Sequence, residues 1–173
     1  MKQTIRTQRL ELVAETVEMA EAETAGRSSL EAALDAFVPE GWPPEGMDAA
    51  DMFAAMLRRD PGQAGWLSWY WILPDPATGT RTLIGCGGFT SPPVRGAVAI
   101  GYSLLREFQG KGFAIEAVKA LIEWAFAHPE VREIIAETTP DNERSRHLLK
   151  KAGFRQKGEA SEPGHLRFAL GRR

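Results

Sequence analysis

The residues Gln109 to Ala114 have the composition of an anion-binding turn. They follow an apolar stretch with a strand pattern and precede an amphipathic stretch with a helix pattern. The two glycines, Gly110 and Gly112, let the backbone approach a ligand closely. The first turn of a helix also has unpaired N–H groups and the positive end of the helix dipole, which together bind anions, most often phosphate. Lys111 adds a local positive charge.

Two common phosphate-binding motifs do not match this turn. A dinucleotide fingerprint that begins at Gly110 needs glycine or alanine five residues later, where the chain has Ile115. A P-loop that ends in Gly110-Lys111 needs glycine where Leu105 stands and a hydroxyl residue where Gly112 stands. Taken alone, the turn is either another kind of phosphate site or an ordinary glycine-containing start of a helix.

A second polar motif lies between Thr139 and Phe154. Asn142 and Ser145 are three residues apart, which places them on one face of a helix near its N-terminus. Apolar residues later in the segment supply contact with a core. Taken alone, this motif is also typical of a capped amphipathic helix, in which Asn142 lies near the cap and Ser145 is solvated.

Together the two motifs resemble the GNAT superfamily of acetyl-CoA-dependent N-acetyltransferases. The family's acyl-CoA loop has Gln or Arg, two residues, Gly, one residue, and Gly or Ala, and Gln109, Gly112 and Ala114 match it. An Asn-x-x-Ser helix followed by Lys-x-Gly-Phe is matched by Asn142, Ser145, Lys151, Gly153 and Phe154. The strand at 100–104 and the opening segment at 7–12 are similar to the ribosomal-protein N-terminal acetyltransferase (RimJ/RimL-type) subgroup.

The resemblance implies an α+β (mixed α/β) fold, with a twisted mixed sheet and helices on both faces. Two parallel central strands, at 97–105 and 134–138, would splay apart, and coenzyme A would enter the gap between them. The pyrophosphate would lie on backbone N–H groups of Gln109, Gly110, Lys111, Gly112, Phe113 and Ala114. The pantetheine arm would pair with the strand edge at Leu104 and Leu105, and contact Asn142 and Ser145.

The implied reaction is direct attack of a neutral amine on the thioester in a ternary complex. A lysine-type amine has a pKa of about 10.4 and an α-amine about 8, so most of either is protonated at neutral pH. The Leu104 N–H is the expected oxyanion donor. Many family members place a tyrosine where this chain has Leu149. The resemblance to the ribosomal-type subgroup, in which the serine of Asn-x-x-Ser serves instead, makes Ser145 the candidate donor to the leaving thiolate, with the alternative that it only binds the cofactor.

The general base is harder to assign. Related sequences often carry a glutamate where this chain has Ala99. Glu137, on the following strand, is the nearest alternative and would act through water, unless it is a surface or ion-paired glutamate. Glu40 and Glu45 are further candidates for binding the acceptor amine. Otherwise the base is supplied elsewhere, the acceptor amine has a low pKa, or the protein is a weak catalyst.

A non-catalytic acyl-CoA-binding module with the same fold is the alternative function, because both the glutamate and the tyrosine are missing. The acceptor stays open in either case. A protein N-terminus, a polyamine, an amino acid and an aminoglycoside would all leave the cofactor motifs unchanged. Free thiol released with a panel of amines separates the enzyme from the binding module.

Hydrophobic patterning predicts the elements that position these motifs. Strands are expected at 5–13, 65–73, 81–90, 97–105, 134–138 and 166–170, and helices from 17, at 28–37, 48–58, 112–127 and 141–152. Thr16 is the expected cap of the first helix. The segment at 38–46 contains three prolines and two glycines and is expected to be a loop. Its Trp42 either lines an acceptor pocket or pins the loop to the core.

The composition is that of an ordinary globular protein. A chain of 173 residues predicts one domain, 1–173, at roughly 150 residues per domain. With 21 basic and 23 acidic residues the net charge is −2, which gives no bulk attraction to nucleic acid or anionic membranes. The expected partners are acetyl-CoA and an amine acceptor, and a homodimer is left open.

Further residue types bear on metal binding and location. The histidines His128, His147 and His165 lack metal-ligand spacing, so no metal is expected. The single Cys86 suits a reducing compartment. The first ten residues have no apolar core of a signal peptide, and no run approaches the roughly 18 apolar residues of a membrane span. These features predict a cytoplasmic protein.

Overall fold

One parallel pair of strands stands near the middle of an otherwise antiparallel sheet. The computed structural model describes residues 2–173, and its eight strands run in the order β1-β2-β3-β4-β5-β6-β8-β7. The strands are β1 (Thr4–Arg6), β2 (Glu11–Ala14), β3 (Ser68–Pro74), β4 (Arg81–Phe89), β5 (Ala97–Leu104), β6 (Glu133–Thr138), β7 (Arg155–Glu159) and β8 (Leu166–Gly171). The helices are α1 (Val17–Ala25), α2 (Arg27–Leu34), α3 (Ala50–Arg59), α4 (Phe113–Phe126) and α5 (Glu143–Lys151).

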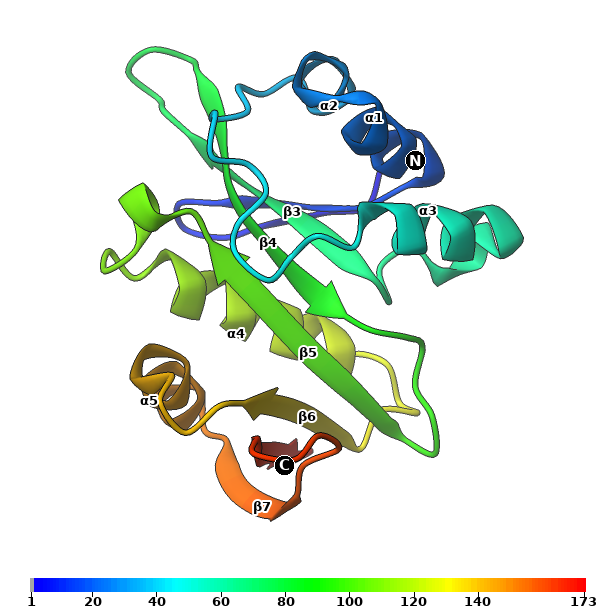
Figure 1. Cartoon of the computed structure of the whole chain (residues 1–173), viewed down its shortest axis with the longest axis vertical. Helices are drawn as coiled ribbons and strands as arrows, with labels where there is room; N and C mark the ends of the chain where they lie inside the picture. The colour runs from blue at the N-terminus through cyan, green and yellow to red at the C-terminus, as the bar shows by residue number, and fades with distance from the viewer. Residues whose placement is uncertain (1) are drawn as a thin grey trace.

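Helices cover both faces of the sheet, as the resemblance implied (Figure 1). The alternation along β3 explains why, since successive side chains of a strand point to opposite faces. Trp69 and Trp71 pack into the core that contains α4 and α5, whereas Tyr70 and Ile72 pack into the core beneath α1 and α2. Because both faces of β3 are apolar, each needs a covering layer. We call these two sides of the sheet the α4 face and the α1–α2 face.

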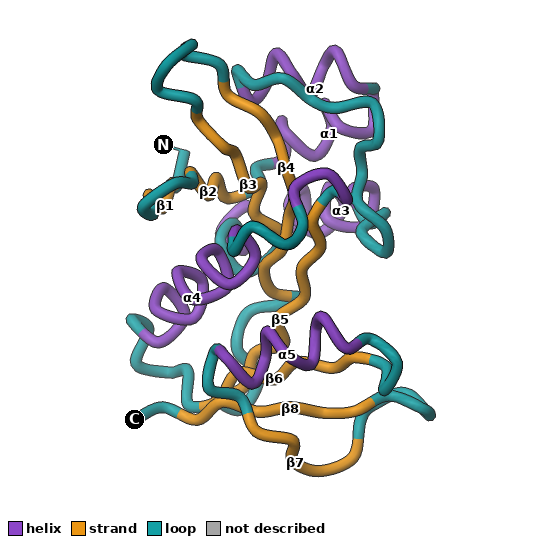
Figure 2. Tube along the Cα trace, turned by 90° about the vertical axis from the view of Figure 1, so that its left-hand side faces the viewer, coloured by secondary structure: helices purple, strands orange, loops and turns teal. Residues whose placement is uncertain are grey.

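The parallel strands β5 and β6 pair over only three residues. Ala97 to Ala99 lie opposite Glu133 to Ile135, and beyond Ala99 the two strands separate. β5 continues along β4 as far as Leu104, whereas β6 continues along β8 as far as Thr138. Figures 1 and 2 show β6 turning away from β5 toward β8 and β7. We call the space between residues 100–104 of β5 and the end of β6 the splay gap.

Several predicted boundaries needed correction. The strand expected at 5–13 is two short strands, β1 and β2, joined by a turn in which the Thr7 N–H donates to the Leu10 carbonyl (2.9 Å). The helix expected to reach residue 37 ends at Leu34, because Asp35 adopts a left-handed conformation (φ 50°). The capping role of Thr16 is confirmed, since its hydroxyl accepts from the Met19 N–H (3.4 Å).

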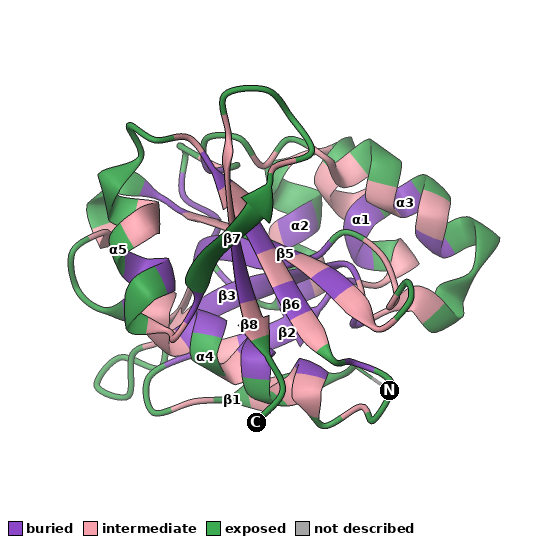
Figure 3. Ribbon diagram, turned by 90° about the horizontal axis from the view of Figure 1, so that it is seen from below, coloured by how far each residue is buried: buried purple, intermediate pink, exposed green. Residues whose placement is uncertain are grey.

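Strand β7 was absent from the sequence prediction. All five of its residues are exposed, and their sequence is Arg-Gln-Lys-Gly-Glu, which carries no apolar alternation. The strand forms because its backbone pairs with β8 at the edge of the sheet (Figure 3). Backbone pairing of this kind leaves no mark on side-chain hydropathy.

Four tryptophans belong to the core of the α4 face or pack against it. Trp69 and Trp71 are fully buried, and Trp66 and Trp124 pack edge to face with centroids 4.6 Å apart.

Every helix among residues 2–173 is too short or too polar to span a bilayer. Over the same residues, no group of three or more His, Cys, Asp or Glu side chains has the geometry of a metal site.

Candidate active site

One wall of the splay gap is an unpaired edge of β5. The Leu105 N–H donates to the Ile84 carbonyl (2.9 Å), and the Thr90 N–H donates to the Ala99 carbonyl (3.2 Å), so these β5 positions hydrogen-bond β4. Because hydrogen bonding alternates along an antiparallel strand, the N–H groups of Tyr102 and Leu104 face the other way, into the gap. An extended ligand lying there would meet free strand donors.

The turn from Gln109 to Gly112 lies beside the C-terminal end of the β5 edge. The Gln109 side chain donates to the Leu104 carbonyl (3.0 Å), which ties the turn to the strand. Gly110 and Gly112 have φ of 77° and 81°, a left-handed conformation that favours glycine. Gly112 is the residue before α4, and no side chain among residues 2–173 caps the helix. The first N–H groups of α4 are therefore available to an anion at an exposed turn.

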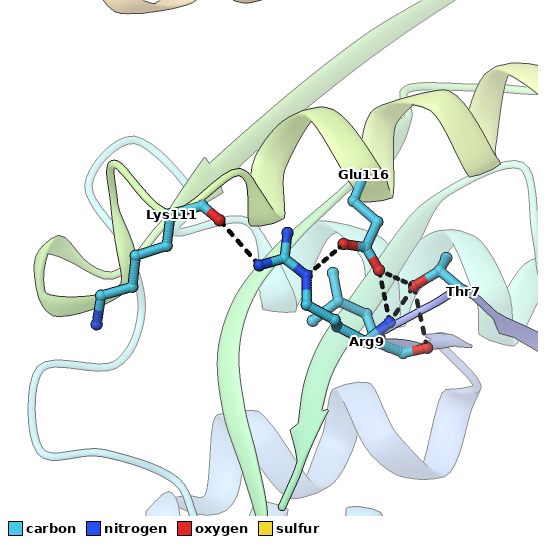
Figure 4. A network of polar contacts seen from close by, with 5 residues as sticks. Thr7, Arg9, Lys111 and Glu116 are labelled. Carbon is cyan, nitrogen blue, oxygen red and sulfur yellow. Dashed lines mark hydrogen bonds and ion pairs between the residues drawn. The ribbon is translucent and has the colours of Figure 1, made fainter.

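A polar network holds the turn from below, and sequence reasoning assigned it no role (Figure 4). Arg9 donates through Nη1 to the Lys111 carbonyl (2.9 Å) and through Nε to Glu116 (2.7 Å). The Thr7 hydroxyl and the Arg9 N–H donate to the other Glu116 oxygen at 2.6 and 2.7 Å. Although partial burial opposes ionisation, the hydrogen bonds from Thr7 and Arg9 lower the pKa of Glu116. The β1–β2 turn thus fixes the position of the glycine turn.

Arg9→Lys tests whether this network positions the turn. Lysine keeps the positive charge but cannot reach Glu116 and the Lys111 carbonyl together, because it lacks the guanidinium fork. We expect affinity for acetyl-CoA to fall about fivefold, the size of one lost hydrogen bond of about 1 kcal/mol, as measured by isothermal titration calorimetry. Arg6→Lys, on the exposed part of β1, is the matched control and should bind normally. Equal affinity in the two variants would contradict a positioning role.

Helix α5 forms the other wall of the gap. Asn142 is its cap residue, and the Asn142 Oδ1 accepts from the Ser145 N–H (3.1 Å), as its position in the sequence motif suggested. The Ser145 hydroxyl lies 3.2 Å from the Tyr102 hydroxyl of β5, so this contact joins the two walls. Leu149 is 1% exposed and contributes only apolar contact. Tyr102 is therefore a candidate residue of this site that the sequence motifs did not indicate.

Glu137 has its two carboxylate oxygens engaged by a single residue. The Ser161 N–H donates to Oε1 (2.9 Å) and the Ser161 hydroxyl donates to Oε2 (2.6 Å). These hydrogen bonds, led by the hydroxyl, lower the pKa of the Glu137 carboxyl. A carboxylate stabilised in this way is a weaker base, so its contacts argue against the predicted relay through water.

Trp42 lies on the α1–α2 face of the sheet, where it pins the loop at 38–46 to the core. Its indole N–H donates to Glu23 (2.8 Å), and its ring lies 6.2 Å from that of Tyr70, so the loop is pinned to the core. The same side chain lines a hollow of about 280 Å³ together with Glu23, Asp48 and Asp51. Of the two loop acids considered for binding the acceptor, Glu45 lies in an exposed pair 3.9 Å from Arg106, and Glu40 is exposed.

The loop that carries Trp42 also reaches the end of β5. A Cβ atom on Gly41 would lie 3.8 Å from the Leu105 side chain. The loop that borders the hollow beside Trp42 therefore also approaches the chain just after β5.

Comparisons with known proteins place the chain among acetyltransferases. A family model described as an acetyltransferase (GNAT) domain matches residues 9–155. The uncharacterized N-acetyltransferase YjdG of Bacillus subtilis is 29% identical over 72% of this chain and 73% of its own length. The [ribosomal protein uS5]-alanine N-acetyltransferase of Escherichia coli is 35% identical, but the match spans 55% of this chain and 49% of that protein.

Solved structures share the fold along nearly the whole chain. A GNAT-family acetyltransferase from Bacillus anthracis has a TM-score of 0.63 at 21% identity, with 98% of both chains covered. The RimJ protein of Mycobacterium smegmatis, solved with CoA-disulfide, has a TM-score of 0.64 at 22% identity, over 98% of this chain and 88% of that one. At this level of identity the likeness concerns the fold alone.

Proposed function

Because the chain belongs to the GNAT acetyltransferase family and so transfers an acetyl group from acetyl-CoA to an amine, we propose that the transfer takes place in the splay gap. The observation that carries this proposal is the unpaired β5 edge at Tyr102 and Leu104, which ends in the uncapped N-terminus of α4. This arrangement supplies backbone donors along an extended ligand and an anion site at its end.

In the proposed complex, acetyl-CoA enters from the α4 face. The N–H groups of residues 110–114 would bind the pyrophosphate, and Lys111 would add charge. The Gln109 N–H, which the sequence motif also offered, instead donates to the Arg106 carbonyl (3.2 Å). The pantetheine arm would run along β5 as an added strand, past Leu104 and Leu105, with Asn142 and Ser145 on the opposite wall. Gly110 and Gly112 support this placement of the pyrophosphate, because both have a positive φ and neither has a side chain that would block the N–H groups at the start of α4.

The acceptor amine would enter from the α1–α2 face, beside Trp42. Its neutral nitrogen attacks the thioester carbon, the oxyanion forms near the Leu104 N–H, and the carbon–sulfur bond breaks. Holding the two reactants together in this geometry accounts for several kcal/mol of the barrier, up to roughly 7–11 kcal/mol in the best cases. Ser145 and the Tyr102 hydroxyl beside it (3.2 Å) are the two candidates for donating toward the sulfur. Glu137 remains a prediction that its contacts with Ser161 disfavour.

The acceptor is a primary amine of a protein N-terminus or of a small molecule. The relative that acetylates a ribosomal protein favours a protein N-terminus as the first class to test. A kanamycin resistance protein of Rhizobium radiobacter, 40% identical over 43% of this chain, favours an aminoglycoside as the second. A cytoplasmic location is part of the proposal and is supported by Cys86, a buried free thiol.

Two measurements test this function. Isothermal titration with acetyl-CoA is expected to show saturable binding in the micromolar range. A thiol-release assay with a peptide bearing N-terminal alanine, spermidine, lysine and kanamycin is expected to give free CoA with at least one of them. Absence of binding heat at high micromolar acetyl-CoA would contradict the proposed site, and binding without thiol release on a wide amine panel would favour the non-catalytic module.

A further inference from the structure

Tyr102 is the polar side chain that joins the two walls of the splay gap, and its hydroxyl lies 3.2 Å from that of Ser145. Its ring is stacked on Trp71, with centroids 6.4 Å apart and planes at 21°, and it packs against the core of the α4 face. We propose that the Tyr102 phenol is the catalytic residue that protonates the leaving sulfur of coenzyme A and that Ser145 positions it. This inference rests on the proposed function.

The position of Tyr102 on β5 puts its hydroxyl on the correct side of the reaction. Its side chain points to the α4 face, from which the thioester would enter, whereas its N–H faces the gap beside that of Leu104. The Tyr102 hydroxyl reaches Ser145 on α5, so it lies across the space between the two walls that the thioester would enter. A thioester with its carbonyl oxygen at the Leu104 N–H would therefore have its sulfur within reach of the Tyr102 hydroxyl.

The chemistry of the phenol also fits better than that of an aliphatic hydroxyl. A tyrosine has a pKa of about 10 and a cysteine-like thiol has one of about 8.5. Because these reference pKa values are close, transfer of a proton from the phenol to the thiolate is only slightly unfavourable. Burial raises the pKa of Tyr102, while the Ser145 contact lowers it, and the net effect keeps the phenol protonated at neutral pH. Leu149, one turn after Ser145, has no proton to give.

The proposed step is balanced in atoms and electrons. A nitrogen–carbon bond forms while the carbon–sulfur bond breaks with its electron pair on sulfur. The Tyr102 proton moves to that sulfur, and the Ser145 hydroxyl returns a proton to the phenolate and regains one from water. The nitrogen loses its extra proton to water. The products are the acetylated amine and the free thiol of coenzyme A.

Tyr102→Phe removes the hydroxyl and keeps the ring against Trp71. We expect kcat in the thiol-release assay to fall about 100-fold, the lower end of what general-acid catalysis contributes, while the Kd for acetyl-CoA changes less than about threefold. Ser145→Ala is expected to lose less, because water can take over its contact with the phenol. Thermal unfolding of each variant checks that the fold is retained.

A second measurement needs no acceptor. If the phenol donates to the sulfur, it stabilises the thiolate of bound CoA, so the thiol pKa of CoA bound to the wild type lies below that of CoA bound to Tyr102→Phe. The pH dependence of the Kd for CoA, with acetyl-CoA as the control that has no thiol, measures this difference. A tyrosine that only packs against Trp71 would leave the thiol pKa unchanged.

Fluorinated tyrosine at position 102 provides a variant of nearly native volume. Because 3,5-difluorotyrosine is a stronger acid, the alkaline limb of the kcat profile is expected to move to lower pH. Full turnover by Tyr102→Phe, an unmoved alkaline limb, or a larger loss in Ser145→Ala than in Tyr102→Phe would each overturn the assignment. Those results would leave the proposed function standing, whereas a wild type that binds no acetyl-CoA would remove the proposed function itself.

Discussion

Replacing Gly112 by glutamate is expected to abolish acetyl-CoA binding, with a loss of affinity of more than about 1,000-fold, or about 4.1 kcal/mol. Gly112 has a φ of 81°, and a Cβ at this position would lie 3.2 Å from Nη2 of Arg9. A side chain here strains the turn and presses on the residue that holds it. The new carboxylate would also stand at the N-terminus of α4, where the proposed diphosphate needs the same backbone donors.

A matched control shows whether the loss comes from the location of Gly112 or merely from adding a strained, negatively charged side chain to the protein. Gly79, in the turn between β3 and β4, has a φ of 73° and open space around its Cβ position. Gly79→Glu therefore introduces a comparable backbone strain and the same charge far from the glycine turn. Isothermal titration should show normal binding by Gly79→Glu and none by Gly112→Glu. If both variants bind acetyl-CoA as the wild type does, the diphosphate does not lie on residues 110–114.

The motifs that sequence reasoning located correctly are those built from neighbours in the chain. The glycine turn, the cap at Thr16 and the Asn142–Ser145 contact each join residues within a few positions, so spacing alone predicts them. The same holds for the long helix α4, which has a complete apolar face. Local backbone geometry of this kind is encoded by residue type and spacing.

What the sequence did not predict depends on contacts between distant residues. Glu116 meets Thr7 across 109 positions, and Tyr102 meets Ser145 across 43. The hydrophobic pattern around these four residues is the same as that around ordinary surface or core residues, so it does not indicate that either pair is in contact. The β1–β2 turn contacts Glu116 only once α4 packs against it, and the Tyr102 phenol faces Ser145 only because β5 and β6 separate. Such roles follow from topology rather than from spacing.

A buried carboxyl on the α1–α2 face, that of Glu15, is also placed by contacts with residues distant in the sequence. Glu15 is 2% exposed, and its Oε1 lies 3.1 Å from the Tyr70 hydroxyl, which lies 2.6 Å from Glu23. One hydroxyl proton cannot serve two carboxylates, so both contacts are satisfied when Tyr70 donates to Glu23 and a protonated Glu15 donates to Tyr70. Burial, and then the negative charge of Glu23, raise the pKa of Glu15 to about 8.

This carboxyl is expected to make the protein less stable as the pH rises from about 5 to about 8. In that window the folded protein keeps a proton on Glu15 that the unfolded chain, with a pKa near 4.5 for this group, has already lost. The free energy of unfolding therefore falls, by up to about 1.4 kcal/mol for each pH unit. Above about pH 8 the folded state has lost the proton too, and the decline stops.

Glu15→Gln is expected to remove most of this pH dependence, because the amide keeps a neutral group beside Tyr70 and Glu23 at every pH. The melting temperature of the wild type should fall by roughly 8–16 °C between about pH 5 and about pH 8, whereas that of Glu15→Gln should stay nearly level. Glu159→Gln, on the exposed strand β7, is the matched control and should follow the wild type. Parallel melting curves for all three proteins across this range would show that Glu15 ionises as an ordinary surface carboxyl.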